Sequence, residues 1–186
     1  MSSLKKMIMM GSQNKRSVFW NQFIKSFKTD SLSAYGMQRI YDSSTGYVTI
    51  SGSPNKDDVY VYNNGTDCMD IPKETDTLLF TVELINPDST NCKSLWLGFG
   101  NSFVIPLTDK TIYQKIFIDN SGYSYPFERY RKGMEFNNTT FRAFGYNLTL
   151  MFGAGNEPTT VEEFYQRIEG IPVDIYAYNP GEIIEW

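Results

Sequence analysis

Short runs of apolar residues alternate with polar ones through most of the chain, which is the pattern of half-buried β-strands. The strongest run, residues 77–85, is apolar enough for the centre of a sheet, and an Asn-Pro-Asp turn at 86–88 ends it. Further strands are predicted at residues 46–52, 59–65 (with a closing Asn-Gly turn), 94–100, 102–106, 111–118, 141–150 and 173–178. Many short strands at near-regular spacing predict a mainly β protein, an antiparallel β-sandwich of the jelly-roll-like type.

One short helix is predicted late in the chain, at about residues 160–169. Three apolar residues share one of its faces at helical spacing: Val161, Phe164 and Ile168. Thr160 precedes Glu163 by three residues, the pattern of a capping box, and Thr159 with Glu162 offers the same pattern one residue earlier. The pattern therefore predicts a capped amphipathic helix that lies on an apolar surface.

A tight turn is predicted before this helix, over residues 152–156. Gly153 and Gly155 permit backbone angles that other residues avoid, and Pro158 suits the approach to a helix start. A glycine loop before a helix can also cradle a phosphate. No Lys-Ser or Lys-Thr follows these glycines, and glutamates at 157, 162 and 163 place negative charge where a phosphate would sit. The sequence therefore favours a structural turn and helix cap.

Composition removes several classes of function. The chain has 186 residues, 17 Lys plus Arg, 21 Asp plus Glu and a net charge of −4, so no basic excess indicates nucleic acid as a partner. Histidine is absent, which excludes Ser-His-Asp or Cys-His catalysis and disfavours a catalytic zinc site. Cys68 and Cys92 are the only cysteines, and their spacing does not decide whether they pair.

The first 30 residues differ from the rest. They are basic and rich in methionine, with no acid before Asp30, and predict an arm (1–30) that docks on another subunit, followed by a sandwich domain (31–186). A frayed terminus explains the same composition equally well. The apolar run at residues 7–10 is too short for a secretion signal, and no stretch approaches the ~20 apolar residues that cross a bilayer. We expect no membrane insertion and a protein made in a cytoplasm or built into a particle there.

Aromatic residues make up 16% of the chain, which admits two interpretations. Core packing and subunit contacts are the favoured one, because aromatics are enriched in strands and in interface centres. The alternative is a glycan-binding face, where rings stack on a sugar. Its best candidates are Tyr123, Tyr125, Arg129 and Tyr130, in the polar segment 121–133, with Arg131 close by in sequence.

Acidic residues provide no convincing site for chemistry. Clusters at 57–58 and 67–70 leave Ca²⁺ binding as a minor alternative to solvated turns. Glycoside hydrolysis needs two facing carboxylates, and Glu83, the only acid in a strongly apolar run, has no evident partner. We therefore predict no catalytic residues, no bound cofactor and no enzyme activity.

Three segments of the sequence resemble structural modules of tailed bacteriophages. The segment at 147–164, which contains Met-Phe-Gly-Ala-Gly-Asn-Glu-Pro-Thr-Thr-Val-Glu-Glu-Phe, is the most specific, and an aromatic-rich stretch follows it at 174–181. Residues 18–24, Val-Phe-Trp-Asn-Gln-Phe-Ile, and 95–101, Leu-Trp-Leu-Gly-Phe-Gly-Asn, are weaker matches. The resemblance thus runs from about residue 18 to the C-terminus.

The resemblance implies a virion protein with a carbohydrate-binding-like sandwich and no catalytic residues. Modules of this kind often continue a longer tail protein, whereas this chain is little more than the module and a short arm. That departure favours a small surface subunit, such as a head fibre or capsid decoration protein, that contacts other virion proteins and forms a homo-oligomer. A tail or fibre module that attaches to host surface glycans is the alternative function.

Overall fold

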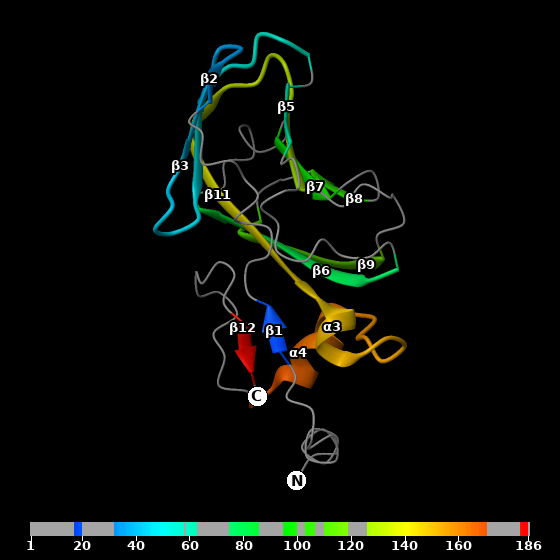
Figure 1. The fold of residues 1–186 in the computed structure, drawn as a ribbon. Helices are drawn as coiled ribbons and strands as arrows, with labels where there is room; N and C mark the ends of the chain where they lie inside the picture. Colours follow the sequence, from blue (N-terminus) through cyan, green and yellow to red (C-terminus); the bar gives the residue numbers. More distant parts are fainter. Residues whose placement is uncertain are drawn as a thin grey trace.

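The protein is mainly β, and most of its strands belong to two antiparallel sheets that face each other (Figure 1). The computed structural model describes residues 17–19, 32–57, 59–62, 75–85, 95–99, 103–106, 110–118, 126–170 and 183–185. The predicted β-sandwich class is confirmed by these two sheets, while the jelly-roll order of connections stays a prediction.

The larger sheet has six strands, in the order β2-β3-β4-β11-β6-β9. Their bounds are β2 Leu32–Ala34, β3 Met37–Tyr41, β4 Val48–Gly52, β11 Phe136–Asn147, β6 Thr77–Ile85 and β9 Ile112–Ile118. Strand β6 lies between β11 and β9, and Leu78 to Leu84 are buried apart from Glu83. This burial on both faces explains why β6 is a nearly continuous apolar run rather than a strict alternation.

The smaller sheet has four strands, in the order β5-β10-β7-β8. Their bounds are β5 Val59–Tyr62, β10 Pro126–Tyr130, β7 Leu95–Phe99 and β8 Phe103–Pro106. Val59, Leu95 and Leu97 point inward and are buried in the main core, together with Phe80 and Val82 of the larger sheet. The core between the sheets therefore joins strands that are distant in the sequence.

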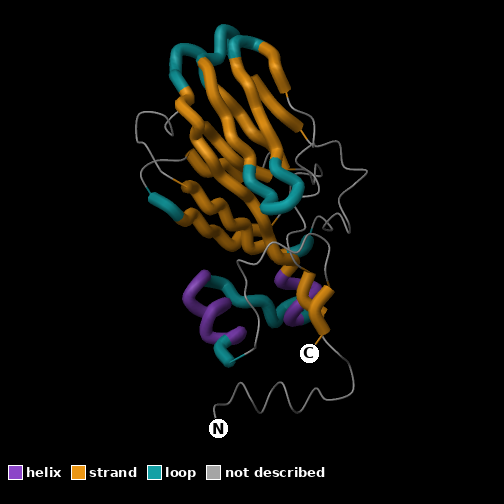
Figure 2. The backbone as a smooth tube through the Cα atoms, turned by 90° about the vertical axis from the view of Figure 1, so that its left-hand side faces the viewer, coloured by secondary structure: helices purple, strands orange, loops and turns teal. Residues whose placement is uncertain are grey.

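A second, smaller core closes one end of the larger sheet. Two helices, α3 (Leu148–Phe152) and α4 (Val161–Ile168), lie together at this end, next to the short strands β1 (Ser17–Phe19) and β12 (Ile183–Glu185) (Figures 1 and 2). Phe164 of α4 is buried, and its ring stacks on Tyr146 of β11 with centroids 5.8 Å apart. Leu79, Phe144, Leu148 and Met151 are the other buried residues of this core. We call this end, formed by α3, α4, β1 and β12, the helical end.

The start of α4 has the local contacts of a capping box. The Thr160 hydroxyl accepts the backbone N–H of Glu163 at 3.1 Å, and the Glu163 carboxylate accepts the backbone N–H of Thr159 at 2.8 Å. The N–H of Thr159 and the guanidinium of Arg167 both lower the pKa of Glu163. The turn before the helix has positive φ at Gly153 (88°) and Gly155 (79°), as left-handed turn positions require.

The chain has a second helix that the sequence pattern did not predict. Strand β11 ends at Asn147, whereas we expected the strand to continue to residue 150. The Asn147 side chain accepts the backbone N–H of Leu150 at 3.1 Å and donates to Asp76 at 2.7 Å. This side-chain cap starts α3, which the described residues contain in addition to α4, the helix that the sequence predicted at about 160–169.

The two ends of the described chain pair with each other at the helical end. Ser17 to Phe19 form β1, which runs antiparallel to β12 and lies opposite Ile183 to Glu185. These three residues lie within the predicted arm (1–30), and the other residues of that arm lie outside the described ranges, so the arm stays a prediction. The expected strand at 173–178 also lies outside them.

Candidate functional site

A row of stacked side chains occupies the outer face of the four-stranded sheet. Arg129 of β10 lies opposite Tyr60 of β5 and opposite Trp96 of β7 in the strand register. Its guanidinium carbon is 5.3 Å from the centroid of the Tyr60 ring and 4.4 Å from that of Trp96. Residues directly opposite each other on one face of an antiparallel sheet are nearest neighbours, so strand pairing itself brings these three side chains together.

A second guanidinium extends this row. Arg131 follows the last residue of β10, and its guanidinium carbon is 5.0 Å from the Trp96 ring centroid. The indole of Trp96 therefore contacts two cationic side chains. We call Tyr60, Arg129, Trp96 and Arg131 the outer ladder. Tyr60 is 39% exposed, Arg131 is exposed, and the other two are half-buried.

The outer ladder combines two chemistries that suit a polar ring-shaped ligand. Tyr and Trp present flat apolar faces with polar edges, and a guanidinium presents several N–H donors in one plane. Cation–π contacts of this kind stabilise by about 0.5–1 kcal/mol each at exposed sites, and they hold long arginine side chains in place. The row is thus a partly ordered surface before any ligand arrives.

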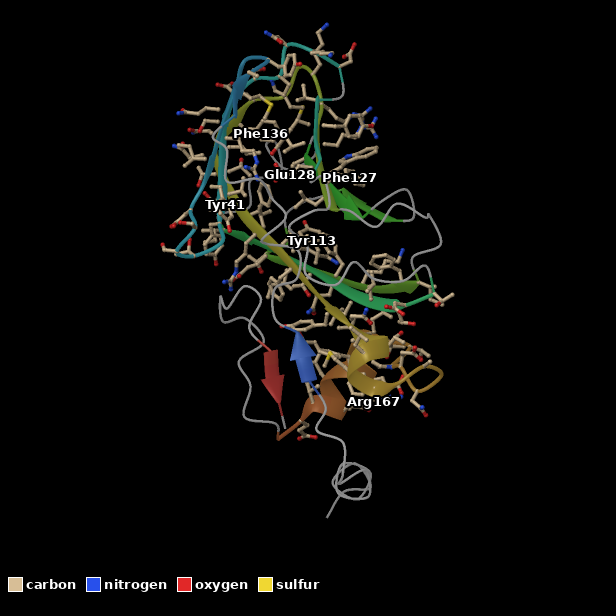
Figure 3. All side chains as sticks on the ribbon, in the orientation of Figure 1. Tyr41, Tyr113, Phe127, Glu128, Phe136 and Arg167 are labelled. Carbon is tan, nitrogen blue, oxygen red and sulfur yellow. The ribbon has the colours of Figure 1, made fainter. Side chains whose placement is uncertain are left out.

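The opposite face of β10 carries a buried ion pair that crosses between the sheets. The Arg39 guanidinium of β3 donates two hydrogen bonds to the Glu128 carboxylate, Nε to Oε2 at 2.8 Å and a terminal nitrogen to Oε1 at 2.6 Å. The Tyr130 hydroxyl also donates to Glu128 Oε2. All three side chains are at most 1% exposed, and Glu128 lies between the two layers in Figure 3. We call Arg39, Glu128 and Tyr130 the inner triad.

Electrostatics keep Arg39 and Tyr130 of the inner triad in a fixed protonation state. Burial alone lowers the pKa of Arg39, but the charge and hydrogen bonds of Glu128 outweigh it, so the pKa lies above its ordinary value. Burial raises the pKa of Tyr130 well above its ordinary value, and the charge of Glu128 raises it further. The guanidinium therefore stays charged and the phenol stays protonated, as their hydrogen bonds to Glu128 require.

The two faces of β10 are linked by the strand geometry. Successive side chains of a strand point to opposite faces, so the inward positions of Glu128 and Tyr130 place Arg129 outward. The bidentate pair with Arg39 fixes which face is inward, because a slip of one residue would bury Arg129 in place of Glu128. The inner triad thus positions the outer ladder.

The structure divides the predicted glycan-binding residues into three groups. Arg129 lies in the outer ladder, next to two rings. Tyr130 is fully buried in the inner triad and cannot touch a glycan, so its assignment was wrong. Tyr123 and Tyr125 lie outside the described residues.

Sequence reasoning missed β10 as a strand and missed two residues of the outer ladder. Residues 126–130 stand in the segment 121–133, which we interpreted as polar and as containing glycine and proline, and not as a strand. The alternation Val59-Tyr60-Val61 and Leu95-Trp96-Leu97 was a usable signal, since the aliphatic residues must face the core and leave the ring outside. Nothing in the sequence showed that these two strands flank β10.

The acidic residues that we considered for glycoside hydrolysis or Ca²⁺ binding form no such site among the described residues. The Glu83 carboxylate, for which the sequence indicated no facing carboxylate, pairs with Arg142 at 2.5 Å and accepts the Tyr47 hydroxyl at 3.2 Å. Asp57 is exposed, while residue 58 and residues 67–70 lie outside the described ranges. Among the described residues, no group of three or more His, Cys, Asp or Glu side chains could hold a metal ion.

The described residues define the class of the fold, an antiparallel β-sandwich with sheets of six and four strands and with helices α3 and α4 at one end. No protein-family model matches the chain, and no curated protein matches it. In the part of the chain that the structure describes, no helix is long and apolar enough to cross a membrane.

Proposed function

We propose that this protein is a non-enzymatic structural subunit of a tailed-phage virion, displayed on the particle surface as a head fibre or decoration protein. The observation that carries the proposal is the resemblance of residues 147–164 to phage structural modules. In the fold, this segment runs from the Asn147 cap through α3 to Phe164 of α4 and contributes much of the second core. A folded module of this kind therefore needs the residues of this segment to form its second core.

The arrangement of the molecule is compatible with attachment at one end and display at the other. Strands β1 and β12 pair at the helical end, while the four-stranded sheet lies in the other half of the molecule (Figure 1). A docking segment that precedes β1 would leave the molecule from the helical end. Other virion proteins are the partners that this proposal requires, with a homo-oligomer as the expected state.

Purified particles provide the test. Mass spectrometry with copy-number measurement is expected to find this protein at a fixed number per virion, and its absence from intact particles would refute the proposal. A chain that lacks residues 1–16 tests the arm and keeps β1, whereas removal of residues 1–30 also takes β1 from its pairing with β12. The shorter deletion should fold normally and fail to join particles; unchanged incorporation would refute the arm.

A second candidate function is attachment to host surface glycans, and the outer ladder favours it. Sugar rings pack against aromatic rings, and Tyr60, which is 39% exposed, and the half-buried Trp96 lie in one row beside the exposed Arg131. A glycan array probed with wild type and Trp96→Ala tests this function. Tyr35→Asn is the matched control, because Tyr35 is an exposed tyrosine (47%) on the β2–β3 hairpin, away from the ladder. Equal signals from wild type and Trp96→Ala would exclude the ladder as the site.

A further inference from the structure

Positive charge exceeds negative charge on the outer face of β10 and in the turn after it. The segment from residue 126 to residue 135 contains five charged residues, which are Glu128, Arg129, Arg131, Lys132 and Glu135. Glu128 points inward, where Arg39 neutralises it, whereas Glu135 is exposed. The three cations and the one remaining acid leave this segment a net charge of +2 outside the core, although the whole chain carries −4.

The two arginines of the outer ladder differ in how they are held. Arg129 is half-buried and lies between the Tyr60 and Trp96 rings, so its guanidinium separates the two rings. Arg131 is exposed and lies over Trp96 from one side. Among the described residues, Arg131 forms no salt bridge. A guanidinium that stacks on a ring can still direct its in-plane N–H groups at a carboxylate.

We propose that the outer ladder binds an acidic glycan, with a sugar carboxylate paired to Arg131 and the sugar ring packed against the aromatic side chains of the ladder. The inference rests on the glycan-attachment candidate and names its ligand class. A neutral sugar would contact the aromatic rings but would form no ion pair with the arginines. Their positive charge is not neutralised by Glu128, because Glu128 faces the core. A carboxylated sugar uses the rings and the charge, because Arg binds carboxylates through two parallel hydrogen bonds.

Nucleic acid is the less favoured polyanion. Proteins that bind single strands combine stacking rings with a basic groove that follows many phosphates. Here the two arginines of the ladder and Lys132 span only the end of β10 and its turn, and the chain is acidic overall. A short row of two rings and two guanidinium groups fits one or two sugar units better than an extended phosphate backbone.

The test uses a matched pair of ligands and a matched pair of variants on the full chain. An array of uronic-acid and sialic-acid oligosaccharides identifies the best acidic ligand, and its methyl ester keeps the ring while removing the charge. Binding is then measured by calorimetry for wild type, Arg131→Gln and Lys132→Gln. Lys132 is the control, because it is an exposed cation one residue further along the same turn.

Esterification and Arg131→Gln are each expected to weaken binding about tenfold or more, as loss of a charged hydrogen-bonded pair does, while Lys132→Gln changes it less than about twofold. Equal affinity for acid and ester would overturn the acidic preference and leave glycan attachment standing. Failure of every acidic glycan to bind, or tighter binding of a single-stranded oligonucleotide that Trp96→Ala abolishes, would overturn the inference. Particle incorporation is measured separately and is unaffected by these outcomes.

Discussion

The two faces of strand β10 both carry charged and aromatic side chains, but one face is buried in the core and the other lies on the outside of the sheet. On the inner face, Arg39, Glu128 and Tyr130 are buried, and every charge is neutralised by a close partner. On the outer face, Arg129 and Arg131 contact aromatic rings, and the Arg131 side chain is exposed to solvent. One face therefore holds charge where water is excluded, and the other holds it where water or a ligand can reach.

The comparison shows what each kind of contact is able to do. A buried ion pair contributes little net stability over apolar packing, but it is costly to break and it specifies the alignment of the strands that it joins. A cation stacked on an exposed ring contributes little to folding, and its hydrogen-bonding edge stays available. We infer that the inner face determines where β10 lies and that the outer face is where β10 can act.

The largest expected effect is that of Glu128→Gln. This change leaves the Arg39 guanidinium buried without its counter-charge, and we expect the free energy of unfolding to fall by about 3–5 kcal/mol in urea titrations. The control replaces the whole triad with apolar groups of similar size, as Arg39→Met, Glu128→Leu and Tyr130→Phe together. This triple variant should recover most of the loss. A fall of less than about 1 kcal/mol for Glu128→Gln would contradict the view that the inner face, unlike the outer face, determines the stability and position of β10.

Tyr130→Phe should have a smaller effect on the same face. The change removes one of the donors to the Glu128 carboxylate and leaves the ring in place. We expect a loss of about 1–3 kcal/mol in the free energy of unfolding, from equilibrium urea denaturation. No measurable loss would show that Arg39 alone satisfies the carboxylate.

The difference between wild type and Tyr130→Phe should also depend on pH. Because burial raises the pKa of Tyr130 in the folded state, the fold favours the protonated phenol. This contribution is complete below the ordinary tyrosine pKa of about 10 and is lost as the pH rises toward the folded value. Unfolding measured from pH 8 to pH 11 should therefore show a constant gap between the two proteins up to about pH 10 and a narrowing gap above it. A gap that widens above pH 10 would contradict the assigned direction.

A double-mutant cycle measures the outer ladder. Arg129→Met keeps the aliphatic stem and removes the guanidinium that contacts two rings, and Trp96→Leu removes one of those rings. We expect a coupling energy of about 0.5–1 kcal/mol between the two changes. A coupling above about 2 kcal/mol would mean that the ladder is as much a part of the folding core as the inner triad.

The smallest expected effect is that of Arg131→Ala on stability. Arg131 is exposed, so its removal should change the free energy of unfolding by no more than about 0.5 kcal/mol. Thermal unfolding followed by circular dichroism provides the measurement. A larger loss would show that Arg131 stabilises the fold, as the residues of the inner triad do, and would contradict its assignment to the binding face.

Local features of the fold were open to prediction, and non-local ones were not. The cap at Thr160 and Glu163 involves residues three positions apart, so the sequence contains both partners of each contact. Strand β6 was predicted with its observed bounds because its apolar run needs no knowledge of its neighbours. By contrast, Arg39 and Glu128 are 89 positions apart, and neither residue by itself indicates the other.

The sequence by itself determined the strand character, the late capped helix and the absence of histidine chemistry, because those follow from periodicity, neighbouring residues and composition. Tertiary structure alone decided that β10 is a strand, that β5 and β7 flank it, and that Tyr130 is buried while Arg129 lies between two rings. The physical reason is that a charged strand becomes stable only when distant segments supply its hydrogen bonds and counter-charge. The candidate binding face is therefore a product of strand pairing, which no single stretch of the chain encodes.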